Sequence, residues 1–327
     1  MRSIRVVLER GGTPESVHLV DGVVLHHGSK DARVFGDASV SAFWRSSMKP
    51  FQALPLVNAM VLRDLGLGKE ALALSCASHH GTPTHTKIVA SMLAALELSE
   101  AALVCGAHRP LDEESARDLD ATATLPGRIH NNCSGKHAGM LALSQACGWP
   151  LSGYHKPAHP LQVAIREELG RWIESDPDEL RWGVDGCGVP TPALPLHEMA
   201  LAYARYGVSE EAGSIAVVTA MTQNPNLISG NTAFSANLMR ATGGRILGKE
   251  GAEGVFCLAC PGGAWGAAFK VADGAMRALG PAVLYGLRTL DLIGASELDR
   301  LRQFTCVPLQ NTRGKEVASL SARGDGE

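Results

Sequence analysis

Strand-like segments lie near both ends of the chain, and a long run of helix-like segments separates them. Apolar and polar residues alternate, as in antiparallel strands, in three segments near the amino end: 4–9, 15–20 and 23–27. Strand character returns late in the chain, in the segments 244–248, 254–260 and 264–271. A sheet assembled from both ends of a chain is one continuous body. The pattern therefore predicts a single α+β domain over residues 1–327, with an antiparallel sheet built from both chain ends.

The middle of the chain, from about residue 45 to residue 240, is predicted to be a mostly helical subregion of that domain. Apolar residues recur there at helical spacing in four segments that Gly, Pro and Asn loops separate: 86–98, 160–174, 215–222 and 234–241. Gly11-Gly12 and Asp21-Gly22 are expected to form turns between the first strands. A last helix is expected at 274–293, interrupted at Gly280-Pro281, and the polar tail 321–327 is expected to be frayed.

Composition and charge exclude several classes of protein. Hydrophobic residues make up 45% of the chain and charged residues 19%, which supports a packed core and not a disordered chain. Lys and Arg number 30 against 33 Asp and Glu, so the chain has no electrostatic footprint for nucleic acid. No apolar run approaches the ~18 residues of a membrane span, and no secretory segment opens the sequence. We expect a cytoplasmic protein with no membrane and no nucleic-acid partner.

The first motif with chemical potential is RSSMKP at 45–50, where Ser46 and Lys49 lie one helical turn apart. A serine hydroxyl becomes nucleophilic when a base takes its proton, and a lysine can be that base if its pKa is lowered. Because Pro50 is tolerated only in the first turn, the helix must begin near Ser46 or Ser47. Its free N–H groups could then hold an oxyanion. The alternative is a capping serine followed by a solvated lysine.

Two further motifs are less specific. ASHHG at 77–81 places Ser78 in a small polar cluster between an apolar stretch and a helix, although Ser78 could simply be a cap. GKEG at 248–251 places Lys249 between glycines at the head of a late strand, where a surface turn is the alternative.

Two of the eight cysteines lie in polar, glycine-rich surroundings, and the rest are expected to be small buried residues. NNCSGKHAGM at 131–140 sets Cys133 beside Lys136 and His137, immediately before an apolar helix. GVDGCGVP at 183–190 holds Asp185 and Cys187 in a tight loop. A packed helix start does not need this combination, and thiolates are good metal ligands. These two motifs predict a metal site.

Taken together, RSSMKP, ASHHG, NNCSGKHAGM, VDGCGVPTPALPL and GKEGAEGVF resemble the rhizobial-type (thermolabile, class 3) L-asparaginase II family. The similarity extends from the first strands to about Val271. It implies a fold similar to serine β-lactamases and glutaminases. It also implies hydrolysis of L-asparagine to L-aspartate and ammonia, a reaction of asparagine catabolism, by a homodimer.

The resemblance also implies roles for individual residues. Two serine–lysine pairs would carry the catalysis: Ser46 with Lys49, and Ser78 with Lys249. A zinc cofactor would be bound by Cys133, Lys136 and Cys187. The substrate would be bound by Arg45, Asp185 and His137. A lysine that ligates zinc must be deprotonated, so zinc binding would depend on pH.

Three interpretations of the motifs remain open at the level of sequence. The first is the serine–lysine amidohydrolase, in which a covalent intermediate forms on a serine. In the second, zinc activates a water that attacks the amide directly. The third is a non-catalytic module that binds zinc or another ligand, with structural serines and lysines.

Overall fold

The computed structural model describes residues 1–29 and 31–324, which divide into two compact units. Unit 1 comprises Met1–Ser47, Leu194–Val208 and Asn237–Glu327. Unit 2 comprises Met48–Ala193 and Ser209–Ala236. The two units are described separately below.

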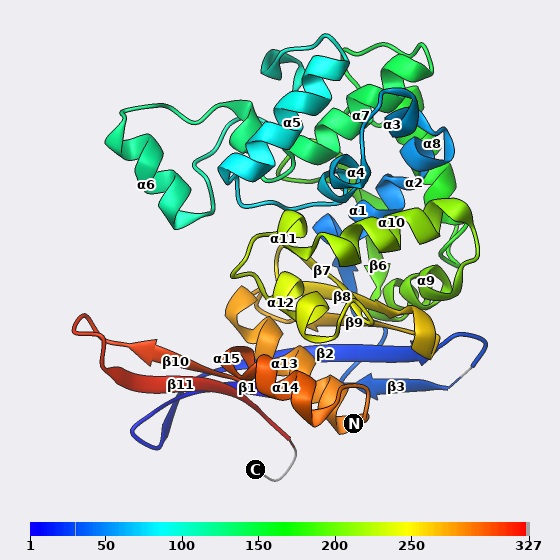
Figure 1. Cartoon of the computed structure of the whole chain (residues 1–327). Helices are drawn as coiled ribbons and strands as arrows, with labels where there is room; N and C mark the ends of the chain where they lie inside the picture. Colours follow the sequence, from blue (N-terminus) through cyan, green and yellow to red (C-terminus); the bar gives the residue numbers. More distant parts are fainter. Residues whose placement is uncertain (30, 325–327) are drawn as a thin grey trace. The chain divides into compact units, whose positions relative to one another are not determined.

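Unit 1 is built on an antiparallel sheet whose strands come from both ends of the chain (Figure 1). Its strands are β1 (Ile4–Arg10), β2 (Thr13–His26), β3 (Ala32–Phe35), β7 (Leu247–Gly251), β8 (Val255–Cys260), β9 (Trp265–Val271), β10 (Cys306–Gln310) and β11 (Glu316–Arg323). They follow the order β10-β11-β1-β2-β9-β8-β7, and β3 pairs with β2. The short β4 (Ser41–Phe43) also belongs to unit 1. The predicted α+β class, with a sheet assembled from both chain ends, is confirmed.

The predicted turn at Asp21-Gly22 is wrong. β2 continues through both residues, and Gly22 lies opposite Phe269 of β9. A Cβ atom on Gly22 would lie 2.6 Å from the Phe269 ring, so this glycine makes room for an aromatic side chain inside the sheet. Gly11 and Gly12, with φ of +56° and +81°, do form the predicted turn between β1 and β2.

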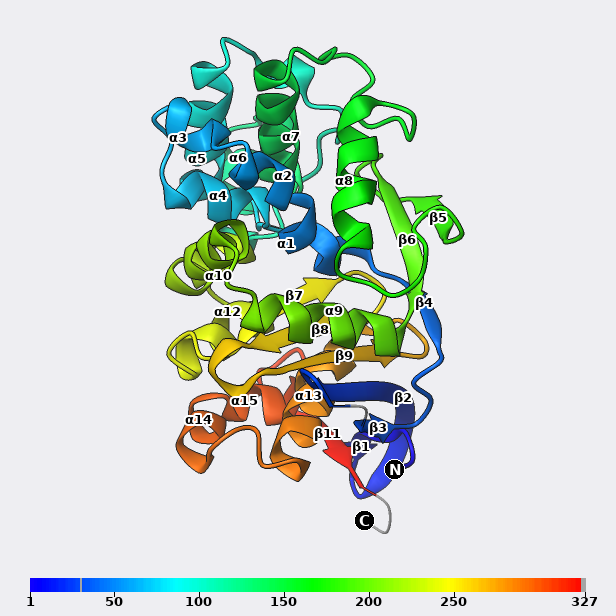
Figure 2. The same ribbon diagram turned by 90° about the vertical axis from the view of Figure 1, so that its right-hand side faces the viewer.

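Helices cover both faces of this sheet (Figure 2). α9 (Leu196–Val208) packs against β2, β8 and β9, and a Cβ atom on Gly266 of β9 would lie 2.2 Å from the backbone nitrogen of Ala204. On the other face, α13 (Leu279–Thr289) packs against β1, β8, β9 and β11. The short helices η4 (Pro261–Gly263), η5 (Met276–Ala278), α14 (Ala295–Arg300) and α15 (Arg302–Thr305) complete unit 1.

Three sequence-based boundaries in unit 1 need correction. The helical subregion predicted over about 45–240 is interrupted, because 194–208 belongs to unit 1 and packs on the sheet. Gly280-Pro281 does not interrupt the late helix but lies in the first turn of α13, where a missing N–H costs nothing. Residues 321–323 are not frayed, since they pair with β1 as the end of β11. The last three residues, 325–327, lie outside the described residues.

Unit 2 is mostly helical. Its helices are α1 (Lys49–Gln52), α2 (Leu54–Asn58), α3 (Val61–Asp64), α4 (Lys69–Ser75), α5 (Pro83–Ala95), η2 (Glu100–Ala102), α6 (Glu113–Ala121), η3 (Arg128–His130), α7 (Ser134–Ala146), α8 (Pro160–Gly170), α10 (Ala212–Gln223) and α11 (Pro225–Ile228). Three elements contain residues of both units: η1 (Arg45–Met48), β6 (Pro190–Pro195) and α12 (Phe234–Ala241). In unit 2, β5 (Arg181–Val184) pairs with β6 through Ala193 as an antiparallel hairpin. None of the described helices is long and apolar enough to cross a membrane.

Close packing of α4 against α7 depends on two glycines one turn apart in α7. A Cβ atom on Gly135 would lie 2.4 Å from the carbonyl oxygen of Leu74, and one on Gly139 would lie 2.7 Å from Ser75 Oγ. A Cβ atom does not approach other non-bonded atoms this closely, so larger residues would push α4 away. The glycines of NNCSGKHAGM therefore hold the carboxyl end of α4 against the start of α7.

We expect Gly135→Ala to lower the free energy of unfolding by about 1–3 kcal/mol, because the new methyl group meets backbone that cannot rotate away. Alanine is otherwise the better helix former by about 1 kcal/mol. Gly207→Ala in α9 is the matched control, since its nearest neighbouring atom would be 3.4 Å away, an ordinary contact. Urea denaturation of both variants checks the prediction. Equal stability of the two would contradict it.

Candidate active site

Lys49 is the first residue of α1 and is fully buried in unit 2. As the sequence predicts, Pro50 lies in the first turn of this helix. The Lys49 Nζ atom is 2.9 Å from Ser78 Oγ, 2.5 Å from the carbonyl oxygen of Ala77 and 3.2 Å from Cys133 Sγ. A carbonyl oxygen only accepts, so one N–H of Lys49 points at Ala77. A neutral amine could donate its other N–H to Cys133 and accept the proton of the Ser78 hydroxyl.

Ser78 follows the end of α4 and is partly exposed, whereas Lys49, which contacts it, is buried. Its backbone N–H donates to the carbonyl oxygen of Ile228 at 2.8 Å. The next N–H, of His79, donates to the carbonyl oxygen of Asn132 at 3.0 Å. The loop is therefore held on both sides, with a hydroxyl that solvent can reach and a buried amine. Because the Ser78 N–H is already used, it is not available to hold an oxyanion.

The other predicted catalytic residues, Ser46 and Lys249, belong to unit 1, as does Arg45. Arg45 has a φ of +54°, a left-handed conformation that is uncommon for a bulky residue and clusters at functional sites. Ser46 follows it and is partly buried. The predicted pairs, Ser46 with Lys49 and Ser78 with Lys249, each join residues of different units and stay predictions.

Lys249 lies in β7 and is fully buried within unit 1. Its Nζ donates to the carbonyl oxygen of Glu250 at 2.8 Å, and its own carbonyl oxygen accepts a hydrogen bond from Ser47 Oγ at 3.2 Å. The N–H of Ser47 donates to the carbonyl oxygen of Trp44 at 3.2 Å, so it is not one of the free N–H groups expected at this helix start.

Sequence reasoning missed the residues that hold Ser47. Tyr203 of α9 is fully buried and donates its hydroxyl to the Ser47 carbonyl oxygen at 2.6 Å. Tyr203 lies in an ordinary apolar helical pattern, and no feature of the sequence distinguishes it from a core residue. The helix α9 therefore supports the backbone beside Ser46 from within unit 1.

The three predicted metal ligands lie together in unit 2. Cys133 immediately precedes α7, Lys136 lies in its first turn, and Cys187 lies in the loop between β5 and β6. All three are buried, and Lys136 Nζ is 3.0 Å from Cys187 Sγ. The loop is closed by a hydrogen bond from Gly188 N–H to the Asp185 carbonyl oxygen at 2.8 Å, and Gly188 supplies the φ of +90° that the loop requires.

Charge is distributed unequally over these groups. A hydrogen bond from the Cys133 thiol to Cys187 lowers the pKa of Cys187 and raises the pKa of Cys133. Burial is the largest single effect and would lower the pKa of Lys136, but the neighbouring Cys187, Cys133 and Asp185 together outweigh it and the pKa is raised. Without a metal, the cluster is therefore a Cys187 thiolate that accepts from the Cys133 thiol and from the Lys136 ammonium.

His137, predicted to bind substrate, is fully buried and faces this cluster. Burial lowers its pKa to about 4. Its Nδ1 is 2.7 Å from the hydroxyl of Tyr154, and that hydroxyl accepts the N–H of Val104. Because burial also raises the pKa of Tyr154, the hydroxyl stays protonated and donates to Nδ1, which leaves the proton of neutral His137 on Nε2. Among the residues that the structure describes, none meets this Nε2 with hydrogen-bond geometry, although Cys187 is near enough to affect the pKa of His137.

The cluster fits zinc. Two sulfurs and one nitrogen form a donor set that zinc accepts, and three protein ligands leave a fourth position open for water or substrate. The orphaned Nε2 of His137 lies beside the same sulfur and could donate to a group in that position. Over residues 1–29 and 31–324, no three His, Cys, Asp or Glu side chains are grouped as metal ligands, so the lysine is essential to this assignment.

A second buried histidine, His79, supports the start of α7. Its Nδ1 accepts the N–H of Gly81 at 3.2 Å, so its Nε2 donates to Ser134 Oγ at 2.8 Å. Ser134 in turn donates to the carbonyl oxygen of Ile129 at 2.8 Å. Burial lowers the pKa of His79 well below its usual value, and the ring stays neutral. His79 therefore links the loop that contains Ser78 to the loop that contains Cys133.

Comparisons with known proteins support one family. A family model described as L-asparaginase II matches residues 6–322, nearly the whole chain. No curated protein sequence matches the chain. Among solved structures, a “putative beta-lactamase” from Bacteroides dorei DSM 17855 is similar at 12% identity and a TM-score of 0.37, over 81% of this chain and 92% of that one.

Proposed function

The chain belongs to the L-asparaginase II family, and from that premise we propose that a serine and a lysine of unit 2 carry its chemistry. The enzyme is an amidohydrolase that acts on L-asparagine, which sets aside the interpretation as a non-catalytic module. The observation that carries the proposal is the distance of 2.9 Å between Lys49 Nζ and Ser78 Oγ.

The proposed reaction has two steps. In the first, neutral Lys49 takes the hydroxyl proton of Ser78 while the oxygen attacks the side-chain amide carbon of asparagine. The lysine then gives this proton to the amide nitrogen, the carbon–nitrogen bond breaks, and ammonia leaves a β-aspartyl ester on Ser78. In the second step, Lys49 takes a proton from a water molecule while the water oxygen attacks the ester carbon. The lysine then returns this proton to Ser78 Oγ as aspartate leaves.

The other two predicted catalytic residues, Ser46 and Lys249, are kept as part of the proposal, although neither belongs to the Lys49–Ser78 contact. Ser46 follows Arg45, whose backbone is strained, and precedes Ser47, whose hydroxyl donates to the Lys249 carbonyl oxygen. Ser46 and Lys249 are therefore both fixed within unit 1. The family resemblance gives Ser46 and Lys249 a catalytic role, and we keep that role as a proposal. Which serine forms the ester is decided by the experiment below.

An acyl-enzyme experiment separates the serine–lysine mechanism from attack by zinc-activated water. Enzyme mixed with asparagine and quenched in acid should carry an aspartyl ester on a peptide that contains Ser78. The same experiment on Ser78→Ala and on Ser46→Ala identifies the nucleophile as the serine whose loss removes the adduct. Activity without any adduct, under conditions where deacylation is slowed by low temperature, would favour the zinc-activated water.

We further propose that Cys133, Lys136 and Cys187 hold one zinc ion. When bound, the zinc would act as a Lewis acid that polarises an oxygen of a ligand in its fourth position. The protein brings the two cysteine sulfurs and the lysine amine together at a buried position, with His137 Nε2 beside them. Lysine and thiols must all lose protons to bind zinc, so the affinity should fall below neutral pH.

Metal analysis of the purified protein is expected to give one zinc per chain, and Cys187→Ser is expected to lose it. The matched control is Cys306→Ser, since Cys306 is an exposed cysteine in β10 of unit 1. A chelator should raise KM for asparagine clearly and change the free energy of unfolding little, because a core of this size forms without a metal. Absence of zinc after incubation with the metal would contradict the site.

Selectivity for asparagine should follow from fixing both charged ends of the substrate. Asp185 would pair with the α-ammonium and Arg45 with the α-carboxylate in a bidentate fork. With both ends held, the extra methylene of glutamine displaces its amide carbon by about one ångström, which can cost on the order of 100-fold in rate. We therefore expect kcat/KM for glutamine to be lower by at least this factor, and Asp185→Ala to lose asparagine binding. Comparable ammonia release from both amides would contradict the assignment of Asp185.

A homodimer and a cytoplasmic location also belong to the proposal, on the strength of the family resemblance and the sequence. Sedimentation equilibrium of the purified protein tests the first, and cell fractionation tests the second. A monomer at micromolar concentration would remove the homodimer from the proposal.

A further inference from the structure

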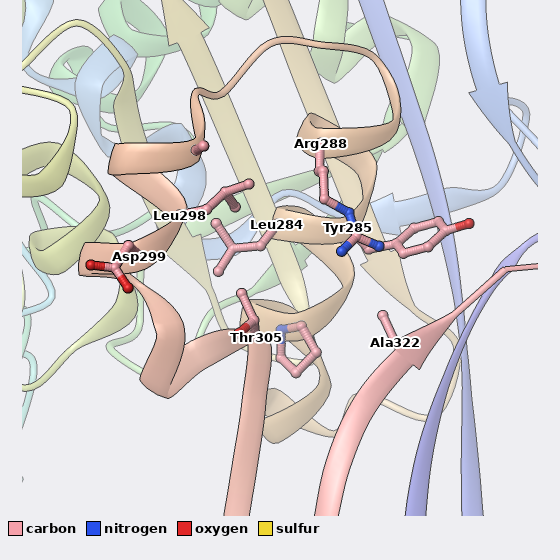
Figure 3. Close-up of a pocket in the computed structure, with 9 residues that line it drawn as sticks. Leu284, Tyr285, Arg288, Leu298, Asp299, Thr305 and Ala322 are labelled. Atoms are coloured by element: carbon pink, nitrogen blue, oxygen red, sulfur yellow. The ribbon is translucent and has the colours of Figure 1, made fainter.

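Unit 1 contains a cavity of about 390 Å³ on the face of the sheet that α13 covers. It is bounded by α13, α14, α15 and β11, and Figure 3 shows the side chains around it. The residues that line it are Pro281, Leu284, Tyr285, Arg288, Ala295, Leu298, Asp299, Thr305 and Ala322. Its volume lies within the range of roughly 300–1,000 Å³ that small-molecule sites occupy.

This cavity is separate from the catalytic groups proposed in unit 1. Ser47 is held by Tyr203 of α9, and α9 covers the opposite face of the sheet (Figure 2). Lys249 lies in β7, the last strand on one side, whereas the cavity borders β11 near the other side. A ligand in this cavity would therefore lie apart from the catalytic residues that are proposed in unit 1.

One side of the cavity is apolar. Pro281 and Leu284 of α13 are buried, Leu298 of α14 lies beside Leu284 (Figure 3), and the exposed Ala295 also lines the cavity. The apolar wall can accept a hydrocarbon group of about the size of a phenyl ring or a branched chain.

The other side carries a guanidinium. Arg288 lies with its guanidinium carbon 5.6 Å from the centroid of the Tyr285 ring, a distance at which the ring face attracts a cation. Figure 3 shows the guanidinium turned toward Tyr285. Across the part of the chain that the structure describes, no carboxylate forms an ion pair with Arg288. An arginine held in one orientation, without an acidic partner and beside an apolar wall, suits the carboxylate of a ligand.

The charge balance of the lining restricts the ligand further. Asp299 is the other charged residue that lines the cavity, and it lies at the end opposite Tyr285 in Figure 3. One cation and one anion leave the lining without net charge, so a phosphate ester or dicarboxylate would meet repulsion that a monoanion bound at Arg288 avoids. A ligand with no anionic group would leave Arg288 without a partner.

We propose that this cavity is a binding site for a small apolar monocarboxylate. The carboxylate pairs with the Arg288 guanidinium in a bidentate fork, and the hydrocarbon part lies against Leu284 and Leu298. Tyr285 fixes the arginine in advance, which limits the entropy lost on binding. The site is independent of the serine–lysine proposal and would hold even if that mechanism were wrong.

The test uses 3-phenylpropionate as the probe and isothermal titration calorimetry of the full chain as the measurement. The neutral isostere 3-phenylpropan-1-ol should bind at least tenfold more weakly, and the dianion phenylsuccinate should also bind more weakly. L-Phenylalanine distinguishes a plain carboxylate from an amino acid, since tighter binding of phenylalanine would show that the site also recognises an ammonium. That outcome would overturn the assignment to a plain monocarboxylate.

Three variants give the proposal its controls. Arg288→Gln should weaken binding of 3-phenylpropionate at least tenfold, while Arg302→Gln, which removes an exposed arginine from α15 outside the lining, should leave it within twofold. Ala295→Phe should abolish binding by filling the cavity from an exposed position without removing a charge. Both of the first two variants change exposed residues and should keep the wild-type melting temperature. No heat of binding at millimolar probe, or equal loss in Arg288→Gln and Arg302→Gln, would overturn the site.

Discussion

Replacing Lys49 with methionine is expected to lower kcat for L-asparagine at least about a thousandfold while the protein remains folded. Methionine has a similar length and no charge, so it fills the buried space but can neither accept the Ser78 proton nor deliver one to the leaving nitrogen. Ser78→Ala should cause a loss of the same order, because the hydroxyl is the other half of the pair.

The double variant provides the sharper test. Residues that act as a unit are not additive, so Lys49→Met with Ser78→Ala should be no slower than the slower single variant. Losses that multiply would show that the two residues act independently. Lys69→Met is the matched control, since Lys69 is an exposed lysine of unit 2 that bonds only the side chain of Gln223 among the contacts described. Circular dichroism and melting temperatures establish that each variant is folded.

Acidification from about pH 7 to about pH 4 is expected to remove about 3 kcal/mol of stability through His137 alone. Its pKa is lowered by burial from 6.5 to about 4 in the folded protein. Between these two values the unfolded chain binds a proton at this residue and the folded chain does not, so stability falls as the pH falls. Above about pH 6.5 the contribution is fully present, and below about pH 4 the loss levels off.

Burial lowers the pKa of His79 and of His85 as well, so both should add to the same acid instability. Urea denaturation at several pH values, with a chelator present throughout, measures the effect without a contribution from metal binding. His137→Gln should reduce the slope of stability against pH, because a neutral amide replaces the titrating ring. His27→Gln, at an exposed position, should leave the slope unchanged. An unchanged slope in His137→Gln would show that this histidine is not held neutral by burial.

One residue predicted that Pro50 lies in the first turn of a helix, although α1 begins at Lys49 and not at Ser46 or Ser47 as expected. Pro50 has no N–H and a restricted φ, so its place in the first turn follows from the covalent chemistry of proline. In the same way, alternation of apolar residues predicted β1, since a strand with one buried face needs that period, whereas β8 is a continuous apolar run that is buried throughout. Local rules of this kind depend only on near neighbours in sequence.

The same rules were wrong at Gly22, Pro281 and the segment 194–208. A glycine can serve a turn or make room for a neighbouring side chain, and Asp21-Gly22 looks the same in both cases. Only the pairing of β2 with β9 shows that Phe269 occupies the space in which a side chain would lie. The helix α9 likewise packs on the sheet because Gly266 of β9 leaves room for its backbone, and the sequence of α9 does not predict this contact.

By itself, the sequence determined the residue types of the site and the family to which they belong. Serine, lysine and cysteine in RSSMKP, ASHHG, NNCSGKHAGM and VDGCGVP specify the chemistry that is available, because reactivity resides in the side chains. Tertiary structure alone decided the contacts. Lys49 at the start of α1 faces Ser78 in the loop after α4, 29 residues away, and Lys136 reaches Cys187 across 51 residues through the loop between β5 and β6. Burial, which sets which of these groups carry charge, likewise depends on the whole packed unit and not on neighbours in sequence.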